Sequence, residues 1–139
     1  MSTVFEDEFM DVQAGLISLC LEVTEEKVDK VYAYCSNEKG CKMFNAFFAV
    51  DGQIKMVHQL GVPDELVVHF LKLGTGDIVT LDNVCKKHKR PAPTELKLYY
   101  DVKTGKFNAD YKYEEVCPAD SEIDSVDVFH EWMEEIKAL

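Results

Sequence analysis

The chain has 139 residues and a formal net charge of -11, with 26 Asp and Glu against 15 Lys and Arg. A chain of this length is expected to form one domain, residues 1–139, and its 47% hydrophobic content excludes disorder of the whole chain. The negative charge argues against direct binding to nucleic acid or to an anionic membrane, because both attract basic surfaces. The negative charge is compatible with binding to a basic partner, and it can also serve solubility alone.

The cysteines and histidines form no pattern that indicates a metal site or an activated nucleophile. The five cysteines are an odd number without a Cys-x-x-Cys pair, which argues against a disulfide framework and a zinc site. The sequence also has no HExxH, no GxGxxG and no P-loop lysine. No segment approaches about 18 consecutive apolar residues, and the start lacks the pattern of a secretion signal. We therefore expect a cytoplasmic protein that is not an enzyme, with no catalytic residues, metal or cofactor.

The first half of the chain predicts one helix and three strands. Apolar residues recur every three or four positions over residues 5–23, as in an amphipathic helix. Residues 28–35 and 43–50 are rich in β-branched and aromatic side chains and predict two strands, the second apolar enough to be covered on both faces. Asp51–Gly52 is typical of a hairpin turn and leads into a third strand over residues 53–59. An antiparallel meander is the simplest interpretation.

A second helical pattern begins near Pro63 and is interrupted by glycines. Gly74–Thr75–Gly76 stands between two apolar stretches, which predicts a helix broken or kinked at this point. The basic run Lys86–Arg90 follows and leads into a proline-rich, non-helical segment. This run could contact phosphate, or it could pair with the acidic terminal segments of the same chain.

The last third of the chain predicts a hairpin and a terminal helix. Residues 96–102 and 107–114 alternate between apolar and polar side chains around a turn that ends at Gly105, and Tyr113 is assigned to the apolar face. A terminal amphipathic helix is predicted from Val126, Phe129, Trp132, Met133 and Ile136. The order of elements predicts an α+β domain: a mostly antiparallel sheet of about five strands, with helices packed on it and a helix at each terminus.

Most of the negative charge lies in the two terminal segments. Residues 1–30 carry eight acids and two lysines, and residues 110–139 carry ten acids and two lysines. Solvated helix faces would explain this distribution without a partner. If a basic partner exists, we predict that it contacts the polar strand face and the loop and helix start that follow. The predicted partner-binding residues are Asp110, Glu114, Glu115, Asp120, Glu122, Asp124 and Asp127.

The hairpin resembles that of the YezG-like family of bacterial immunity proteins. In residues 94–116, Gly105–Lys106–Phe107 and Asp110–Tyr111–Lys112–Tyr113–Glu114 match two motifs that recur in that family. Residues 25–34, which read EEKVDKVYAY, are similar to a third motif. The order of helix, sheet, helix and hairpin agrees with the family over nearly the whole chain.

The resemblance implies inhibition rather than catalysis. Members of this family are cytosolic antidotes that bind the C-terminal domain of a secreted polymorphic toxin, often a nuclease. For this chain the resemblance implies a cognate toxin domain as partner, basic and of the nuclease type, and no direct contact with nucleic acid. The alternative is a small intracellular ligand-binding or regulatory domain with a pocket between sheet and helices. A hydrolase is a third alternative, for which no motif in the sequence argues.

Overall fold

Three helices pack on a single antiparallel sheet. The computed structural model describes residues 4–118 and 122–139. The elements, in chain order, are α1 (Phe5–Val23), β1 (Lys30–Glu38), β2 (Cys41–Val50), β3 (Gln53–Met56), the 3-10 helix η1 (Val57–Leu60), α2 (Asp64–Lys87), β4 (Glu95–Asp101), β5 (Phe107–Lys112) and α3 (Ser125–Lys137). The five strands lie in the order β3-β2-β1-β4-β5. The α+β class, the antiparallel sheet of five strands and the terminal helices are as the sequence predicts.

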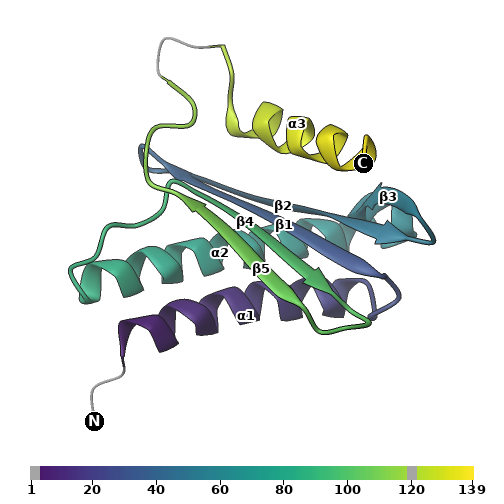
Figure 1. Ribbon diagram of the computed structural model, residues 1–139, viewed down its shortest axis with the longest axis horizontal. Helices are drawn as coiled ribbons and strands as arrows, with labels where there is room; N and C mark the ends of the chain where they lie inside the picture. Colours follow the sequence, from purple (N-terminus) through teal and green to yellow (C-terminus); the bar gives the residue numbers. More distant parts are fainter. Residues whose placement is uncertain (1–3, 119–121) are drawn as a thin grey trace.

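The sheet separates two apolar cores. Helices α1 and α2 cover one face, and α3 lies across the other (Figure 1). The larger core, on the α1–α2 side, contains Leu16, Phe44, Phe48 and Leu98. The smaller core is mostly aromatic and lies under α3; its buried residues are Tyr32, Tyr34, Phe47, Phe129, Trp132 and Met133. Strand β2 contributes to both cores, which confirms the prediction that it is covered on both faces.

Helix α2 is continuous, so the predicted break at the glycines is wrong. It runs from Asp64 to Lys87 without interruption, and Gly74 is one of its buried residues. A Cβ atom on Gly74 would lie 2.0 Å from Cδ2 of Phe44, a buried side chain of β2. Glycine is therefore required here because α2 approaches the sheet closely, not because the helix ends. The predicted third strand is also shorter than expected, since the residues after Met56 form η1.

The β4–β5 hairpin has the predicted faces except at its end. Leu98, Tyr100, Phe107 and Tyr111 all belong to the core on the α1–α2 side. Tyr113 was assigned to the same face, and this is wrong: β5 ends at Lys112, and Tyr113 is 51% exposed. Side chains alternate between the two sheet faces only within a β-strand, so the pattern does not place a residue beyond the end of β5.

Helix α3 uses Phe129, Trp132, Met133 and Ile136 as its apolar side, as predicted. Val126 does not belong to that side, because it is 48% exposed in the first turn of the helix. Val128 packs against the core under α3 in its place. None of the helices in the described ranges is long and apolar enough to cross a membrane.

Candidate functional site

The structure places the predicted acidic residues along one connected stretch from β5 to α3. Asp110 is exposed on β5, on the sheet face opposite α1 and α2, where it is paired in register with Lys97 of β4. Glu114 and Glu115 follow β5 and are exposed, as is Glu122 shortly before α3. Asp120 lies outside the described residues. The described members of the predicted set are exposed, and their contact with a partner stays a prediction.

Asp124 and Asp127 cap the start of α3. The Asp127 backbone N–H donates to the Asp124 carboxylate at 2.9 Å, and the Asp124 N–H donates to the Asp127 carboxylate at 3.1 Å. This reciprocal capping satisfies two backbone donors that a helix N-terminus otherwise leaves unpaired. The two negative charges also lie at the favourable end of the helix dipole. Both residues remain exposed, so they fix the start of α3 and still contribute charge to the surface.

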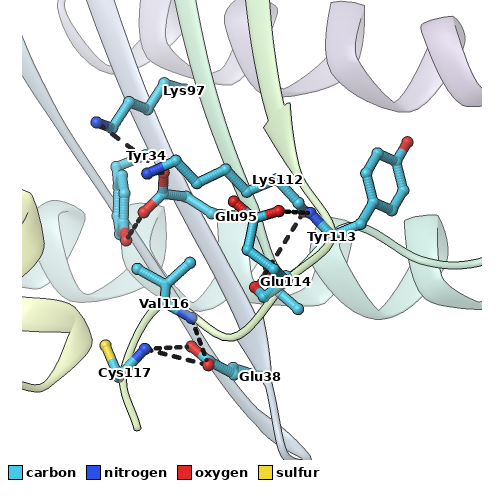
Figure 2. A network of polar contacts seen from close by, with 10 residues as sticks. Tyr34, Glu38, Glu95, Lys97, Lys112, Tyr113, Glu114, Val116 and Cys117 are labelled. Carbon is cyan, nitrogen blue, oxygen red and sulfur yellow. Dashed lines mark hydrogen bonds and ion pairs between the residues drawn. The ribbon is translucent and has the colours of Figure 1, made fainter.

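The segment that follows β5 is bound to the end of the sheet where β1 finishes and β4 begins. The backbone N–H groups of Val116 and Cys117 donate to the Glu38 carboxylate at 2.8 and 3.1 Å (Figure 2). The Thr94 hydroxyl donates to the Glu114 carbonyl at 2.6 Å, and Glu115 forms an ion pair with Lys39. These contacts fix the position of the segment that carries Glu114 and Glu115. The charge of Glu115 is partly compensated by its ion pair with Lys39.

A buried carboxylate that sequence reasoning missed lies beneath this segment. The Glu95 side chain on β4 is 3% exposed, and its Oε2 accepts a hydrogen bond from the Tyr34 hydroxyl at 2.7 Å. Lys97 and Lys112 approach Oε1 to 3.9 and 3.8 Å, and both point toward the carboxylate in Figure 2. Burial, reinforced by the bond to Glu95, raises the pKa of Tyr34, so its hydroxyl keeps the proton it donates.

This network compensates the buried charge rather than creating a reactive group. A buried carboxylate is costly unless it is hydrogen-bonded and paired with opposite charge. Tyr34, Lys97 and Lys112 supply those partners from three strands, so Glu95 ties β1, β4 and β5 together. The period-2 pattern places Glu95 and Lys97 on one face, but only the structure shows that the Glu95 side chain is buried.

The basic run at the end of α2 is largely paired within the molecule, by Lys86, Lys87, His88 and Arg90. Lys87 contacts Glu8 at 2.8 Å, His88 also pairs with Glu8, and Arg90 approaches Glu6 at 3.7 Å. Of the two interpretations of Lys86–Arg90, the structure therefore supports pairing with the acidic N-terminal segment.

Acids without an ion-pair partner occur in both terminal segments. Within residues 4–118 and 122–139, Asp110, Glu122, Glu131 and Glu135 make no ion pair with a basic side chain. Glu134 pairs with Lys137 on its own helix. In the N-terminal segment Asp7, Asp11, Glu22 and Glu26 likewise make no ion pair within the described residues, so acidic charge without an internal partner lies on both sides of the sheet.

The Glu8 pair predicts a pH-dependent contribution to stability. Hydrogen bonds from Lys87 and His88 lower the pKa of Glu8. Because the folded-state pKa is lowered, this stabilisation is complete above the usual carboxylate pKa and is lost as the pH falls toward the lowered value. We expect Glu8→Gln to reduce the loss of stability on acidification, measured as the urea midpoint at several pH values. Glu22→Gln, an exposed acid of the same helix, is the control and should keep the original profile; identical profiles for the two variants would contradict the prediction.

Four of the five cysteines, Cys20, Cys35, Cys85 and Cys117, are not activated for nucleophilic chemistry. Cys20, Cys35 and Cys85 are buried, as expected, and burial raises the pKa of each thiol. Burial and the nearby carboxylates, Glu38 first, raise the pKa of Cys117 as well. These four thiols are protonated at neutral pH, whereas the nucleophilic form is the thiolate. The described residues contain no group of three or more His, Cys, Asp or Glu placed to hold a metal ion.

A cleft of about 490 Å³ bears on the ligand-binding alternative. It lies where the end of α1, β2, β3 and the start of α2 meet, at the rim of the fold rather than between sheet and helices. Its charged lining residues include Glu25 and Lys27, which are exposed. Thr24, the buried polar residue of the lining, already donates its hydroxyl to the Cys20 carbonyl at 2.9 Å. A ligand here would meet few polar groups that are both buried and unpaired.

Neither the protein-family models nor the curated proteins give a match to this chain. The resemblance to the YezG-like immunity proteins therefore stays a prediction from the sequence.

Proposed function

We propose that this chain is an immunity protein that acts in the cytoplasm by binding a cognate toxin domain, basic and of the nuclease type, in a stoichiometric complex. The observation that carries the proposal is the exposed acidic charge between β5 and the end of α3. Asp110, Glu122, Glu131 and Glu135 have no ion-pair partner among the described residues, and Lys86, Lys87 and Arg90 are already paired with acids of α1 and α2. The motif resemblance in residues 94–116 supports the same function.

The proposed mechanism is occlusion of a basic surface. A nuclease holds its substrate by the phosphate backbone, so its site is positively charged. An acidic protein surface is attracted to such a site at long range, and the attraction increases the association rate. The bonds to Glu38 and the capping of α3 hold the two described ends of the acidic segment in place before binding, which lowers the entropy lost in the complex. The inhibitor needs no catalytic group for this task.

Co-expression with the adjoining gene tests the proposal. The C-terminal domain encoded there should arrest growth when it is produced alone, and this chain should restore growth. The two purified proteins should elute as one complex of equal stoichiometry. A toxic domain that neither binds this chain nor is neutralised by it would refute the proposed function.

Charge reversal tests the predicted surface. We expect Asp110→Lys combined with Glu122→Lys to slow association with that domain about tenfold at low salt, because these charges steer the encounter. The difference should shrink as salt rises, since exposed charges are screened within about 10 Å at 0.1 M. Stopped-flow or surface-binding kinetics at several salt concentrations would measure both effects.

The matched control is Asp64→Lys combined with Glu65→Lys, which reverses two exposed acids at the start of α2 on the other side of the sheet. It should leave most of the association rate and of its salt dependence unchanged. If the two double variants behave alike, the interface does not include Asp110 and Glu122, and the immunity function is then tested only by the co-expression experiment.

A further inference from the structure

Strand β5 is an edge of the sheet. Among the described residues its only strand neighbour is β4. The Asp101 N–H donates to the Lys106 carbonyl at 2.9 Å, and Asn108, Asp110 and Lys112 continue that register. In an antiparallel ladder every second residue bonds to the neighbour and the residues between them point outward. The backbone groups of Phe107, Ala109 and Tyr111 are therefore directed away from the sheet, ready to pair with another strand.

An apolar groove lies beside this edge, on the side of α1. Its volume is about 280 Å³, and it is lined by Met10, Ala14, Ile17 and Leu21 of α1 and by Tyr100 and Phe107 of the hairpin. Toward the other end of β5 the space is closed by Tyr111. Its hydroxyl donates to Oε1 of Gln13 at 2.7 Å, and its ring centroid is 5.4 Å from that of Phe9. The groove is thus open next to Phe107, the residue with which β5 begins.

An unpaired strand edge next to an apolar groove matches the requirements for strand addition. A strand that pairs with β5 would lie about 4.8 Å from it and direct alternate side chains to opposite faces. One set would enter the groove between α1 and the hairpin. The other set would lie beside Asn108 and Asp110 on the opposite face. Backbone hydrogen bonds would supply affinity, and the groove would select apolar side chains at every second position.

The surrounding charge determines which strand fits. A shallow hollow that shares Ser18 and Leu21 with the groove is lined by Glu22, Glu25 and Glu26. Asp11, also exposed, precedes these acids on α1. A second copy of this chain would bring another net charge of -11 to the same place. The field therefore favours a basic occupant over a second copy.

We propose that the β5 edge accepts an extended basic segment of the partner protein as a sixth strand, with its alternate apolar side chains in the groove between α1 and the hairpin. The inference rests on the proposed function for the nature of that partner, and it locates the partner's contact. Asp110 lies on the same strand, so this edge is continuous with the acidic surface described above.

A synthetic peptide tests the edge without the toxin. The probe is an acetylated, amidated peptide of about eight residues, with the sequence Lys-Val-Lys-Val-Thr-Val-Lys-Val. Amide hydrogen exchange of the full chain is followed by NMR with and without it. In the unbound protein the amides of Phe107, Ala109 and Tyr111 should exchange faster than those of Asn108 and Asp110. Bound peptide should slow the three outward amides about tenfold or more, because they gain hydrogen-bond partners.

A pair of α1 variants tests the groove. Ala14→Arg places a long side chain in the groove lining, and we expect it to weaken peptide binding about tenfold. Gly15→Arg adds the same charge one residue along, at a position where a Cβ atom meets nothing within 4 Å, and it should bind as the parent does. Equal weakening by both variants would assign the effect to charge alone and overturn the groove as the site.

Three other results would overturn the proposal. One is the absence of binding up to about 1 mM peptide, and another is binding without protection of Phe107, Ala109 and Tyr111. The third is protection of the same amides by self-association, seen as a dimer in sedimentation, which would make a second copy the occupant. Each of these leaves the co-expression result unaffected, and failure of the co-expression test would leave a positive peptide result in place.

Discussion

Phe129→Ala is expected to lower the free energy of unfolding by about 3–5 kcal/mol, as buried phenylalanines do when they are truncated in a core. Phe129 is 0% exposed, and its ring centroid lies 6.0 Å from that of Tyr34 and 5.8 Å from that of Phe47. Only Trp132 and Met133 are buried beside it on α3. Removing its ring therefore deletes a large part of the contact between α3 and the sheet. Urea denaturation followed by Trp132 fluorescence would measure the loss.

Val126→Ala is the matched control on the same helix. Val126 is exposed, so its replacement should change the stability by no more than about 0.5 kcal/mol. The comparison also bears on function, because α3 carries Asp124, Asp127, Glu131 and Glu135. An unchanged midpoint for Phe129→Ala would show that α3 is not docked on the sheet. The acidic side chains of this helix would then have no fixed place in a binding surface.

Local patterns in the sequence predict most of the elements of this fold. The period-2 alternation in the hairpin and the spacing of Phe129, Trp132 and Met133 on α3 identify both elements and their buried faces. Such patterns depend on neighbours in the sequence, and they stop being informative where an element ends. The interpretation fails at Tyr113 and Val126 for that reason, since Tyr113 lies one residue beyond β5 and Val126 is in the first turn of α3.

The candidate site depends more on contacts between distant segments. The tyrosine that bonds Glu95 is 61 residues away from it in the sequence, and Glu38 reaches backbone groups 78 residues further along the chain. The spacing of residues within a short stretch of sequence does not predict such contacts. By contrast, the capping pair at Asp124 and Asp127 has a recognisable signature, an acid followed by a second acid three residues later before an apolar run. The acidic surface was predicted from composition, whereas its support by this network required the structure.

The ion pairs within the molecule bear on where the proposed basic partner would bind. Two acids of the first turns of α1 contact Lys87, His88 and Arg90, so this pair of oppositely charged segments partly cancels. Asp110, Glu122, Glu131 and Glu135, between β5 and the end of α3, make no ion pair among the described residues, and the β5 edge of the sheet adjoins them. The proposed basic partner would bind on this side of the molecule, and variants there will be the most informative.

Gly74→Ala is expected to lower the free energy of unfolding by about 1–3 kcal/mol, although alanine is the better helix former. The added Cβ would lie 2.0 Å from Cδ2 of Phe44, and Phe44 is itself held by the ring of Phe70 at a centroid distance of 5.1 Å. The ring has little room to move, so either α2 must shift from the sheet or the core must deform. Chemical denaturation of the purified variant would measure the cost.

Gly76→Ala provides the contrast within the same helix. A Cβ atom at Gly76 meets nothing within 4 Å, so only helix propensity changes, and the variant should be more stable by about 1 kcal/mol. Two glycines that are two residues apart are thus expected to give effects of opposite sign. If both alanine variants stabilise the protein, then α2 does not approach β2 as closely as Gly74 and Phe44 indicate. If both destabilise it, the glycines mark a distortion of the helix, as the sequence pattern alone predicts.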